Sequence, residues 1–251
     1  MAEDNGKVAL VSGAGRGIGR ATADKLSADG YTTIGFDVAI DAEEAPSSWS
    51  LVQCDVADEE AMSALFDRVR SEHGRLDVLV NVAGIVLVKP LAETEWSEYR
   101  RMVDVNLGGV FLGCKHAIPL MDESGGGVIV NLSSVSAHVG QIDHSLYGAT
   151  KGAVLAIGRA LAWELAPLNI RVASVSPGSV DTEMLRSDIR IEAERTGSTF
   201  DEVKAIREKE QALGRWADPS EIAEAVSFLA SGKASFVTGA DLLVDCGWVA
   251  R

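Results

Sequence analysis

Short apolar runs rich in β-branched residues alternate with amphipathic stretches along almost the whole chain, and this alternation most narrows the folds open to it. Seven runs have the length and composition of buried strands, at residues 7–13, 31–37, 51–55, 76–84, 127–134, 170–176 and 240–245. Helical periodicity marks residues 16–29, 58–73, 95–122 and 147–166, and a segment that begins at Asp218. Strands separated by helices pair in parallel, with helices on both faces. The pattern therefore predicts a doubly wound α/β fold of Rossmann type with a seven-stranded parallel sheet.

Length and composition fit a single domain over residues 1–251. The chain has no linker, repeat or low-complexity segment, and 47% of its residues are hydrophobic, which is enough for a sizeable core. Two segments depart from the regular alternation. Residues 38–50 contain Pro46 and are short for a full helix, and the helical region 95–122 is interrupted near residues 106–109.

The charge balance excludes several classes of partner. With 23 Lys and Arg against 37 Asp and Glu, the net charge of −14 is a poor match for nucleic acid or anionic lipid. The three cysteines form no CxxC pair, and no His and Cys cluster suggests a metal. No apolar run approaches the ~18 residues of a membrane span, and the first residues do not resemble a signal peptide. We expect a cytoplasmic protein that needs no metal.

A glycine-rich turn connects the first predicted strand to the first predicted helix. Gly13, Gly17 and Gly19 have the spacing GxxxGxG within residues 12–19, SGAGRGIG. Glycine permits a tight turn and lets backbone N–H groups approach a pyrophosphate at the helix N-terminus. In the first βαβ unit of a series, this spacing favours a dinucleotide site over a turn without a ligand.

Two residues bear on which dinucleotide is bound. Asp37 ends the second predicted strand, where a carboxylate accepts hydrogen bonds from the adenosine ribose and repels a 2′-phosphate. Arg16, within the turn, could instead pair with a 2′-phosphate, and Asp37 could simply cap a turn. A 2′-phosphate beside the Asp37 carboxylate would be a like-charge contact in a partly desolvated pocket, which is costly. We therefore give Asp37 more weight than Arg16 and predict NAD.

Three polar residues indicate chemistry on an alcohol or a ketone. Tyr147 and Lys151 are four positions apart, which places them on one face of a helix. A phenol with a reference pKa of ~10 is a poor base at neutral pH, but a nearby ammonium stabilises the phenolate and makes the pair a candidate general acid or base. Ser134 ends the fifth predicted strand, at the carboxyl edge of the sheet where ligands bind.

Taken together, these motifs resemble the short-chain dehydrogenase/reductase family. The likeness runs from Lys7 to the Asp245-Cys246-Gly247 turn and rests on residues 12–19, Asp55, Asn81-Val82-Ala83-Gly84, Asn106, Ser134, Tyr147, Lys151 and Pro177-Gly178. The GxxxGxG form is that of the compact branch with YxxxK, rather than the longer epimerase-like branch. Ser12 stands where threonine is commoner, Val82 replaces an asparagine, and Cys246 replaces a glycine.

The resemblance implies a role for each matching residue. Tyr147 would be the general acid/base, and Lys151 would lower its pKa and hold the nicotinamide ribose. Ser134 would orient the substrate oxygen, and Asn106 would hold a water that relays protons from Lys151. The implied NAD-binding residues are Gly13, Gly15, Arg16, Gly17, Ile18, Gly19, Asp37, Asp55, Val56, Asn81, Ala83, Gly84, Tyr147, Lys151, Pro177, Gly178, Val180 and Thr182.

The substrate side is predicted to be apolar and covered by a lid. The expected substrate is a medium-sized, largely uncharged secondary alcohol or ketone, with His144 as its polar contact beside Ser134 and Tyr147. The predicted apolar walls are Val86, Leu87, Val88, Ile142 and Leu146. Residues 182–214 exceed the ~12–15 residues of a normal connection and are predicted to form a lid of two short amphipathic helices. Its charges, Asp188 among them, are expected to remain in water. A rigid excursion or an oligomer contact is the alternative for this segment.

These observations predict an NAD(H)-dependent oxidoreductase that interconverts a secondary alcohol and its ketone. An NADPH-dependent 3-oxoacyl-carrier-protein reductase is the near alternative, and Asp37 and the net charge of −14 count against it. A non-catalytic dinucleotide sensor would need neither Tyr147 nor Lys151. Apolar residues around the helices 95–122 and 147–166, and the pairing of these helices in the family, imply a homotetramer.

Overall fold

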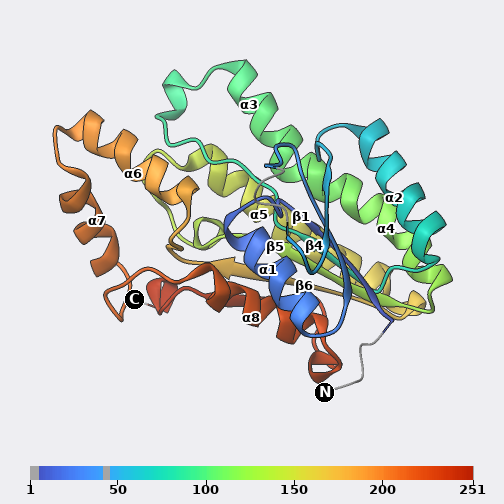
Figure 1. Cartoon of the computed structure of the whole chain (residues 1–251). Coiled ribbons are helices and arrows are strands. Elements are labelled where there is room, and N and C mark those ends of the chain that lie inside the picture. Colours follow the sequence, from blue (N-terminus) through green and yellow to red (C-terminus); the bar gives the residue numbers. More distant parts are fainter. Residues whose placement is uncertain (1–5, 42–45, 251) are drawn as a thin grey trace.

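A computed structural model gives the arrangement of residues 6–41 and 46–250. The strands are β1 (Val8–Ser12), β2 (Thr32–Asp37), β3 (Ser50–Gln53), β4 (Val78–Asn81), β5 (Gly127–Leu132), β6 (Ile170–Pro177) and β7 (Asp241–Val244). The α-helices are α1 (Gly17–Ala28), α2 (Glu59–His73), α3 (Trp96–Val103), α4 (Gly109–Glu123), α5 (Ser145–Glu164), α6 (Glu183–Thr196), α7 (Phe200–Lys209) and α8 (Pro219–Ala230). The strands form one sheet in the order β3-β2-β1-β4-β5-β6-β7, and every neighbouring pair is parallel (Figure 1). The predicted seven-stranded parallel sheet is confirmed.

Alternate side chains of β1 fill the two opposite faces of this sheet. Val8 and Leu10 belong to a core that α2, α4 and α5 cover. Ala9 and Val11 belong to a second core, covered by α1 and α8. This division follows from the strand geometry, because successive side chains point to opposite faces. The strand order reverses between β1 and β4, and the carboxyl ends of these strands flank the crevice where such sheets bind ligands.

Local capping chemistry sets the predicted starts of two helices. The Asp58 carboxylate accepts a hydrogen bond from Ala61 N at 3.0 Å, at the start of α2. At the start of α8, Asp218 accepts from Ser220 N at 2.9 Å, and Glu221 accepts from Asp218 N at 2.8 Å. These contacts satisfy N–H groups that the first turn of a helix cannot pair internally.

The two irregular segments are also where the pattern placed them. The interruption expected near residues 106–109 is a π-helix, Asp104–Gly108, between α3 and α4. Between β2 and β3, residues 38–41 and 46–49 contain no helix, and residues 42–45 lie outside the described part of the chain. The π-helix matters for the site, because such turns are frequent where a helix carries a functional group.

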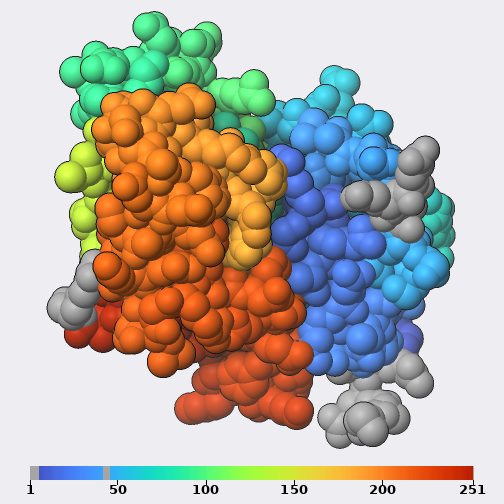
Figure 2. Space-filling model, turned by 60° about the vertical axis from the view of Figure 1, so that its left-hand side comes forward, coloured from blue at the N-terminus to red at the C-terminus, as the bar shows by residue number. Residues whose placement is uncertain are grey.

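Residues 182–214 form α6 and α7, which confirms the two short helices predicted there. They share a small hydrophobic cluster that is separate from the two cores of the sheet. Its buried members are Ile189, Ala193, Val203 and Trp216. Figure 2 shows these helices in orange, beside the blue N-terminal part of the chain. Met184 and Ile206, on the same two helices, are exposed and lie outside this cluster.

None of the helices within residues 6–41 and 46–250 is long and apolar enough to cross a membrane. In those same stretches, no group of three or more His, Cys, Asp or Glu side chains is arranged to hold a metal ion.

Candidate active site

A cleft at the carboxyl ends of the strands gathers most of the predicted site residues. Its volume is about 780 Å³, within the ~300–1,000 Å³ typical of small-molecule sites. The predicted residues that line it are Gly13, Arg16, Gly17, Ile18, Gly19, Asp37, Asp55, Val56, Ala83, Gly84, Ser134, His144, Tyr147, Lys151, Pro177, Gly178, Val180 and Thr182. Three others, Gly15, Asn81 and Asn106, do not line the cleft, and each instead holds a neighbouring group in place.

The glycine-rich turn has a backbone that other residues could not adopt easily. Gly13 and Gly17 have φ angles of +66° and +57°, in the left-handed region that favours glycine. A Cβ on Gly19 would lie 2.0 Å from the Gly13 carbonyl oxygen. This close approach brings the N-terminus of α1 to the cleft, where the N-cap residue Arg16 makes no side-chain capping bond. First-turn N–H groups placed in this way suit a phosphate.

Two backbone donors fix the Asp37 carboxylate at the end of β2. Its Oδ2 accepts a hydrogen bond from Gly15 N at 3.0 Å, and its Oδ1 accepts from Ala39 N at 3.3 Å. Gly15 therefore positions the carboxylate rather than lining the cleft. Arg16 lines the same cleft and is exposed, so both residues that bear on the choice between NAD and NADP face it.

Residues behind the cleft floor brace the central strands. Ser12 Oγ accepts hydrogen bonds from Val82 N at 2.9 Å and from Ala83 N at 3.0 Å, so this serine supplies the hydroxyl that the turn needs. Asn81 is buried, and its Nδ2 donates to Asn131 Oδ1 at 2.8 Å, joining β4 to β5. Its side chain packs between the sheet and α4, so it braces the strands, and the expected contact of Asn81 with the cofactor stays a prediction.

Tyr147 and Lys151 lie one turn apart on α5. Lys151 Nζ is 5.8 Å from the centre of the Tyr147 ring and donates a hydrogen bond to the Leu132 carbonyl at 2.9 Å. Ser134 follows β5, and its Oγ is 3.1 Å both from Ser136 N, from which it accepts, and from Ser136 Oγ, to which it donates. Folding therefore brings the phenol, the ammonium and the serine hydroxyl to one cleft.

Asn106 lies in the π-helix with its side chain fully buried. Its Oδ1 accepts a hydrogen bond from Ile85 N at 2.8 Å, and its Nδ2 donates to Ile85 O at 2.9 Å. The same Nδ2 donates to Thr150 Oγ1 at 3.1 Å. The side chain thus ties the segment after β4 to the helix that carries Lys151. The proton relay expected of Asn106 stays a prediction.

Burial dominates the ionisation of the tyrosine and the lysine. It raises the pKa of Tyr147 to about 12; Ser134 acts against this increase, and the negative charge of Asp188 adds to it. Burial also lowers the pKa of Lys151 to about 8. The expectation that the ammonium lowers the tyrosine pKa stays a prediction. Desolvation disfavours the charged form of each group, and the ammonium is bound to the Leu132 carbonyl.

The substrate end of the cleft is more polar than predicted. His144 lines it and is buried, with its ring centre 6.3 Å from that of Tyr147. Asp188, which we expected to remain in water, is only 8% exposed and lines the same cleft. The sequence contained the signal, since Asp188 lies three positions after Leu185 and directly before Ile189, on the apolar face of α6.

The predicted apolar walls are only partly present. Val86 lines the cleft, whereas Ile142 is 86% exposed. Leu146 faces a separate hollow that it shares with Trp96, because it is one helical position away from Tyr147 and therefore points in another direction. Further polar side chains that line the cleft were missed from the sequence, among them Arg100, Arg101, Ser136, Gln141 and Arg207.

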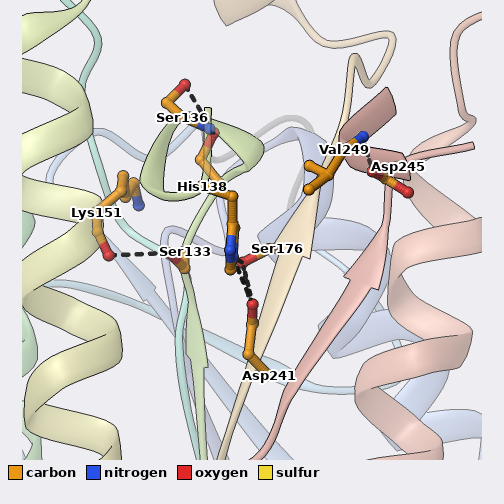
Figure 3. A network of polar contacts seen from close by, with 9 residues as sticks. Ser133, Ser136, His138, Lys151, Ser176, Asp241, Asp245 and Val249 are labelled. Carbon is orange, nitrogen blue, oxygen red and sulfur yellow. Dashed lines mark hydrogen bonds and ion pairs between the residues drawn. The ribbon is translucent and has the colours of Figure 1, made fainter. Parts of the chain in front are cut away.

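A second polar network braces the segment after β5 (Figure 3). His138 Nε2 is 2.7 Å from Asp241 Oδ2 and 3.3 Å from Ser176 Oγ, and Ser176 Oγ donates to the Asp241 carboxylate at 2.9 Å. Ser133 Oγ donates to the Lys151 carbonyl at 2.9 Å. These contacts join the segment after β5 to β6, β7 and α5.

Comparison with known proteins gives consistent matches over nearly the whole chain. A family model described as enoyl-(acyl carrier protein) reductase matches residues 13–249. The chain is 41% identical to cis-4-hydroxycyclohexanecarboxylate dehydrogenase of Sinomonas cyclohexanicum, over 97% of each chain. It is 35% identical to cyclopentanol dehydrogenase of Comamonas testosteroni, over 100% of each chain.

Solved structures give the same result. The ligand-free aldohexose dehydrogenase of Thermoplasma acidophilum superposes with a TM-score of 0.91 at 36% sequence identity. The match covers 99% of this chain and 95% of that one. The similarity therefore includes the sheet, the helices on both of its faces and the segment that follows β6.

Proposed function

The chain belongs to the short-chain dehydrogenase/reductase family, and on that premise we propose that it interconverts a secondary alcohol and its ketone with NAD as cofactor. The observation that carries the proposal is the meeting of Ser134, Tyr147 and Lys151 with the glycine-rich turn in one cleft. A binding module would need the turn alone. The relatives named above are dehydrogenases of small alcohols, which supports the same reaction class.

The shape of the cleft suits a dinucleotide. Gly13 leaves space beside the backbone of Ala83 that a side chain would fill, since a Cβ there would lie 3.0 Å from that backbone. The N-terminus of α1 would hold the pyrophosphate, and Asp37 would accept hydrogen bonds from the adenosine ribose. The fixed carboxylate favours NAD over NADP, because a 2′-phosphate would place a second negative charge beside it. Lys151 would hold the nicotinamide ribose.

When bound, the cofactor supplies the nicotinamide that takes up or gives back the hydride. The chain's own part is to hold the substrate oxygen and to move its proton. Ser134 would donate a hydrogen bond to that oxygen, and Tyr147 would take the hydroxyl proton in oxidation or give it in reduction. A phenol with a pKa of about 12 is a weak base at neutral pH. A cation close to its oxygen would favour the phenolate, and Lys151 is the nearby candidate.

We assign α6 and α7 as a lid over the substrate end of the cleft. Their cluster around Ile189 and Val203 is separate from the two cores of the sheet, so the pair can move as one body. Closure would exclude water around the reacting atoms. Limited proteolysis tests the lid: NADH with a substrate analogue should suppress cleavage within residues 182–214. If neither ligand slows the cleavage, residues 182–214 would be a rigid segment rather than a lid.

The test of the function is a cofactor and substrate panel. Nicotinamide absorbance would be followed with cyclopentanol, cyclohexanol and an acetoacetyl thioester, each with NAD(H) and with NADP(H). We expect the alcohols to be oxidised with NAD⁺. Turnover of the thioester with NADPH in preference to the alcohols would instead support the carrier-protein reductase, which Asp37 and the net charge of −14 disfavour.

Tyr147→Phe tests the assignment of the proton-transfer group. The variant should lose at least the ~10²–10⁴-fold typical of general acid/base catalysis, while NADH binding, measured by fluorescence, is retained. Tyr99→Phe is the matched control, because Tyr99 is on α3 and does not line the cleft. Near-normal turnover by Tyr147→Phe would remove the proposed mechanism.

A further inference from the structure

The Asp188 carboxylate is buried at the substrate end of the cleft. It is 8% exposed, and among the described residues no hydrogen bond or ion pair reaches its side chain. Burial raises its pKa, and the positive charge of Arg207 acts in the opposite direction, as would a protonated His144. A buried charge is costly unless something pairs with it. Because Asp188 lines the cleft, a ligand there can reach its oxygens.

His144 presents a second acceptor to the same cleft. Its Nδ1 is 2.7 Å from the Ile142 carbonyl oxygen. A carbonyl can only accept, so Nδ1 carries the proton, and Nε2 of the neutral ring is left as an acceptor. His144 is 7% exposed and lines the cleft near Tyr147. Asp188 also acts on Tyr147, whose pKa it raises. Both acceptors therefore lie close to the reacting phenol.

The arginines near Asp188 are already engaged. Arg207 Nη2 is 2.6 Å from Glu192 Oε2, and both side chains are largely buried. Arg195 is paired with Asp143. A substrate carboxylate at this end of the cleft would meet the negative charge of Asp188, with these cations held by other acids. A hydroxyl group of the substrate would instead donate a hydrogen bond to the Asp188 carboxylate, which accepts none from the described residues.

We propose that Asp188 and His144 form a subsite that accepts a hydrogen bond from a second hydroxyl group of the substrate. The preferred substrates are then diols and other hydroxylated secondary alcohols, not hydroxy acids or simple alcohols. This inference rests on the proposed function and adds to it the class of substrate. It makes Asp188 a residue that decides specificity, while Tyr147 moves the proton.

The first test compares substrates with the wild-type protein. The values of kcat/KM with NAD⁺ would be measured for cyclohexanol, the isomers of 1,2-, 1,3- and 1,4-cyclohexanediol, 4-aminocyclohexanol and 4-hydroxycyclohexanecarboxylate. The best diol should exceed cyclohexanol by about 10- to 100-fold, the effect of a hydrogen bond to a charged group. The hydroxy acid should be poorer than the best diol.

Two variants then locate the subsite. Asp188→Ala should reduce the ratio of diol to cyclohexanol kcat/KM toward one, and should do so mainly through KM. Asp188→Leu, which fills the volume of the carboxylate, should give the same ratio if the alanine variant folds poorly. Glu194→Ala is the matched control, because it removes an exposed acid from the same helix and should leave the ratio unchanged.

The outcomes separate this inference from the proposed function. If no alcohol is oxidised with either cofactor, the proposed function fails. If cyclohexanol and the diols are oxidised equally, or if the hydroxy acid or 4-aminocyclohexanol is preferred, the function stands and the hydroxyl subsite is refuted. A diol preference that persists in Asp188→Ala and Asp188→Leu would also overturn the role of Asp188.

Discussion

Asn106→Ala is the perturbation whose effect follows most directly from the structure. The side chain is fully buried and makes three hydrogen bonds, two to the backbone of Ile85 and one to Thr150. At about 1 kcal/mol for each bond, their loss should lower the free energy of unfolding by about 3 kcal/mol. For a chain of this size, that corresponds to a fall in melting temperature of about 6–12 °C.

The assay is thermal unfolding followed by circular dichroism at one fixed protein concentration, since an oligomer would make the melting temperature depend on concentration. Gln53→Ala is the control. This exposed amide makes one hydrogen bond, to the Val38 carbonyl, and its loss should change stability by no more than about 0.5 kcal/mol.

A double-mutant cycle sharpens the test of Asn106. Thr150→Val removes the same hydrogen bond from the other side, so the two variants should be coupled by about 1 kcal/mol. A melting temperature for Asn106→Ala within about 2 °C of the parent would refute the reasoning, because it would mean that water replaces all three bonds at almost no cost. Zero coupling in the cycle would show that the Asn106–Thr150 contact does not stabilise the fold.

Three further predictions follow from single features. Asp37→Ala should raise kcat/KM with NADP⁺ relative to NAD⁺, and a parent protein that already prefers NADP⁺ would mean that Arg16 outweighs Asp37. Asp188→Asn should raise the melting temperature at pH 7, because burial holds the pKa of Asp188 above its usual range and the charged form therefore destabilises the fold. That gain should shrink as the pH falls through the raised pKa of Asp188, where the native carboxyl becomes protonated, and a gain independent of pH would contradict the assignment. Phe111 and Trp163 are 55% and 87% exposed, so light scattering at micromolar concentration should show the predicted homotetramer; a monomer would rule it out.

The sequence alone determined the features that depend on local chemistry. The turn after β1 needs glycine at three positions. Gly13 and Gly17 have positive φ angles, and Gly19 lies too close to the Gly13 carbonyl for a side chain. The capping residues Asp58 and Asp218 satisfy N–H groups within a few positions of themselves. The spacing of Tyr147 and Lys151 places both on one helix face whatever surrounds the helix. The alternation of strands and helices fixed the parallel sheet for the same reason, since βαβ connections allow few arrangements.

Only the tertiary structure decided what surrounds each side chain. Asn81 joins β4 to β5 because its side chain donates a hydrogen bond to Asn131, fifty positions later in the chain. The pKa of Tyr147 depends on burial by several elements and on a charge from α6. Asp188 became a buried acceptor because α6 packs with its apolar face towards the rest of the chain. Desolvation and charge interactions sum over neighbours that are distant in sequence, so no local pattern contains them.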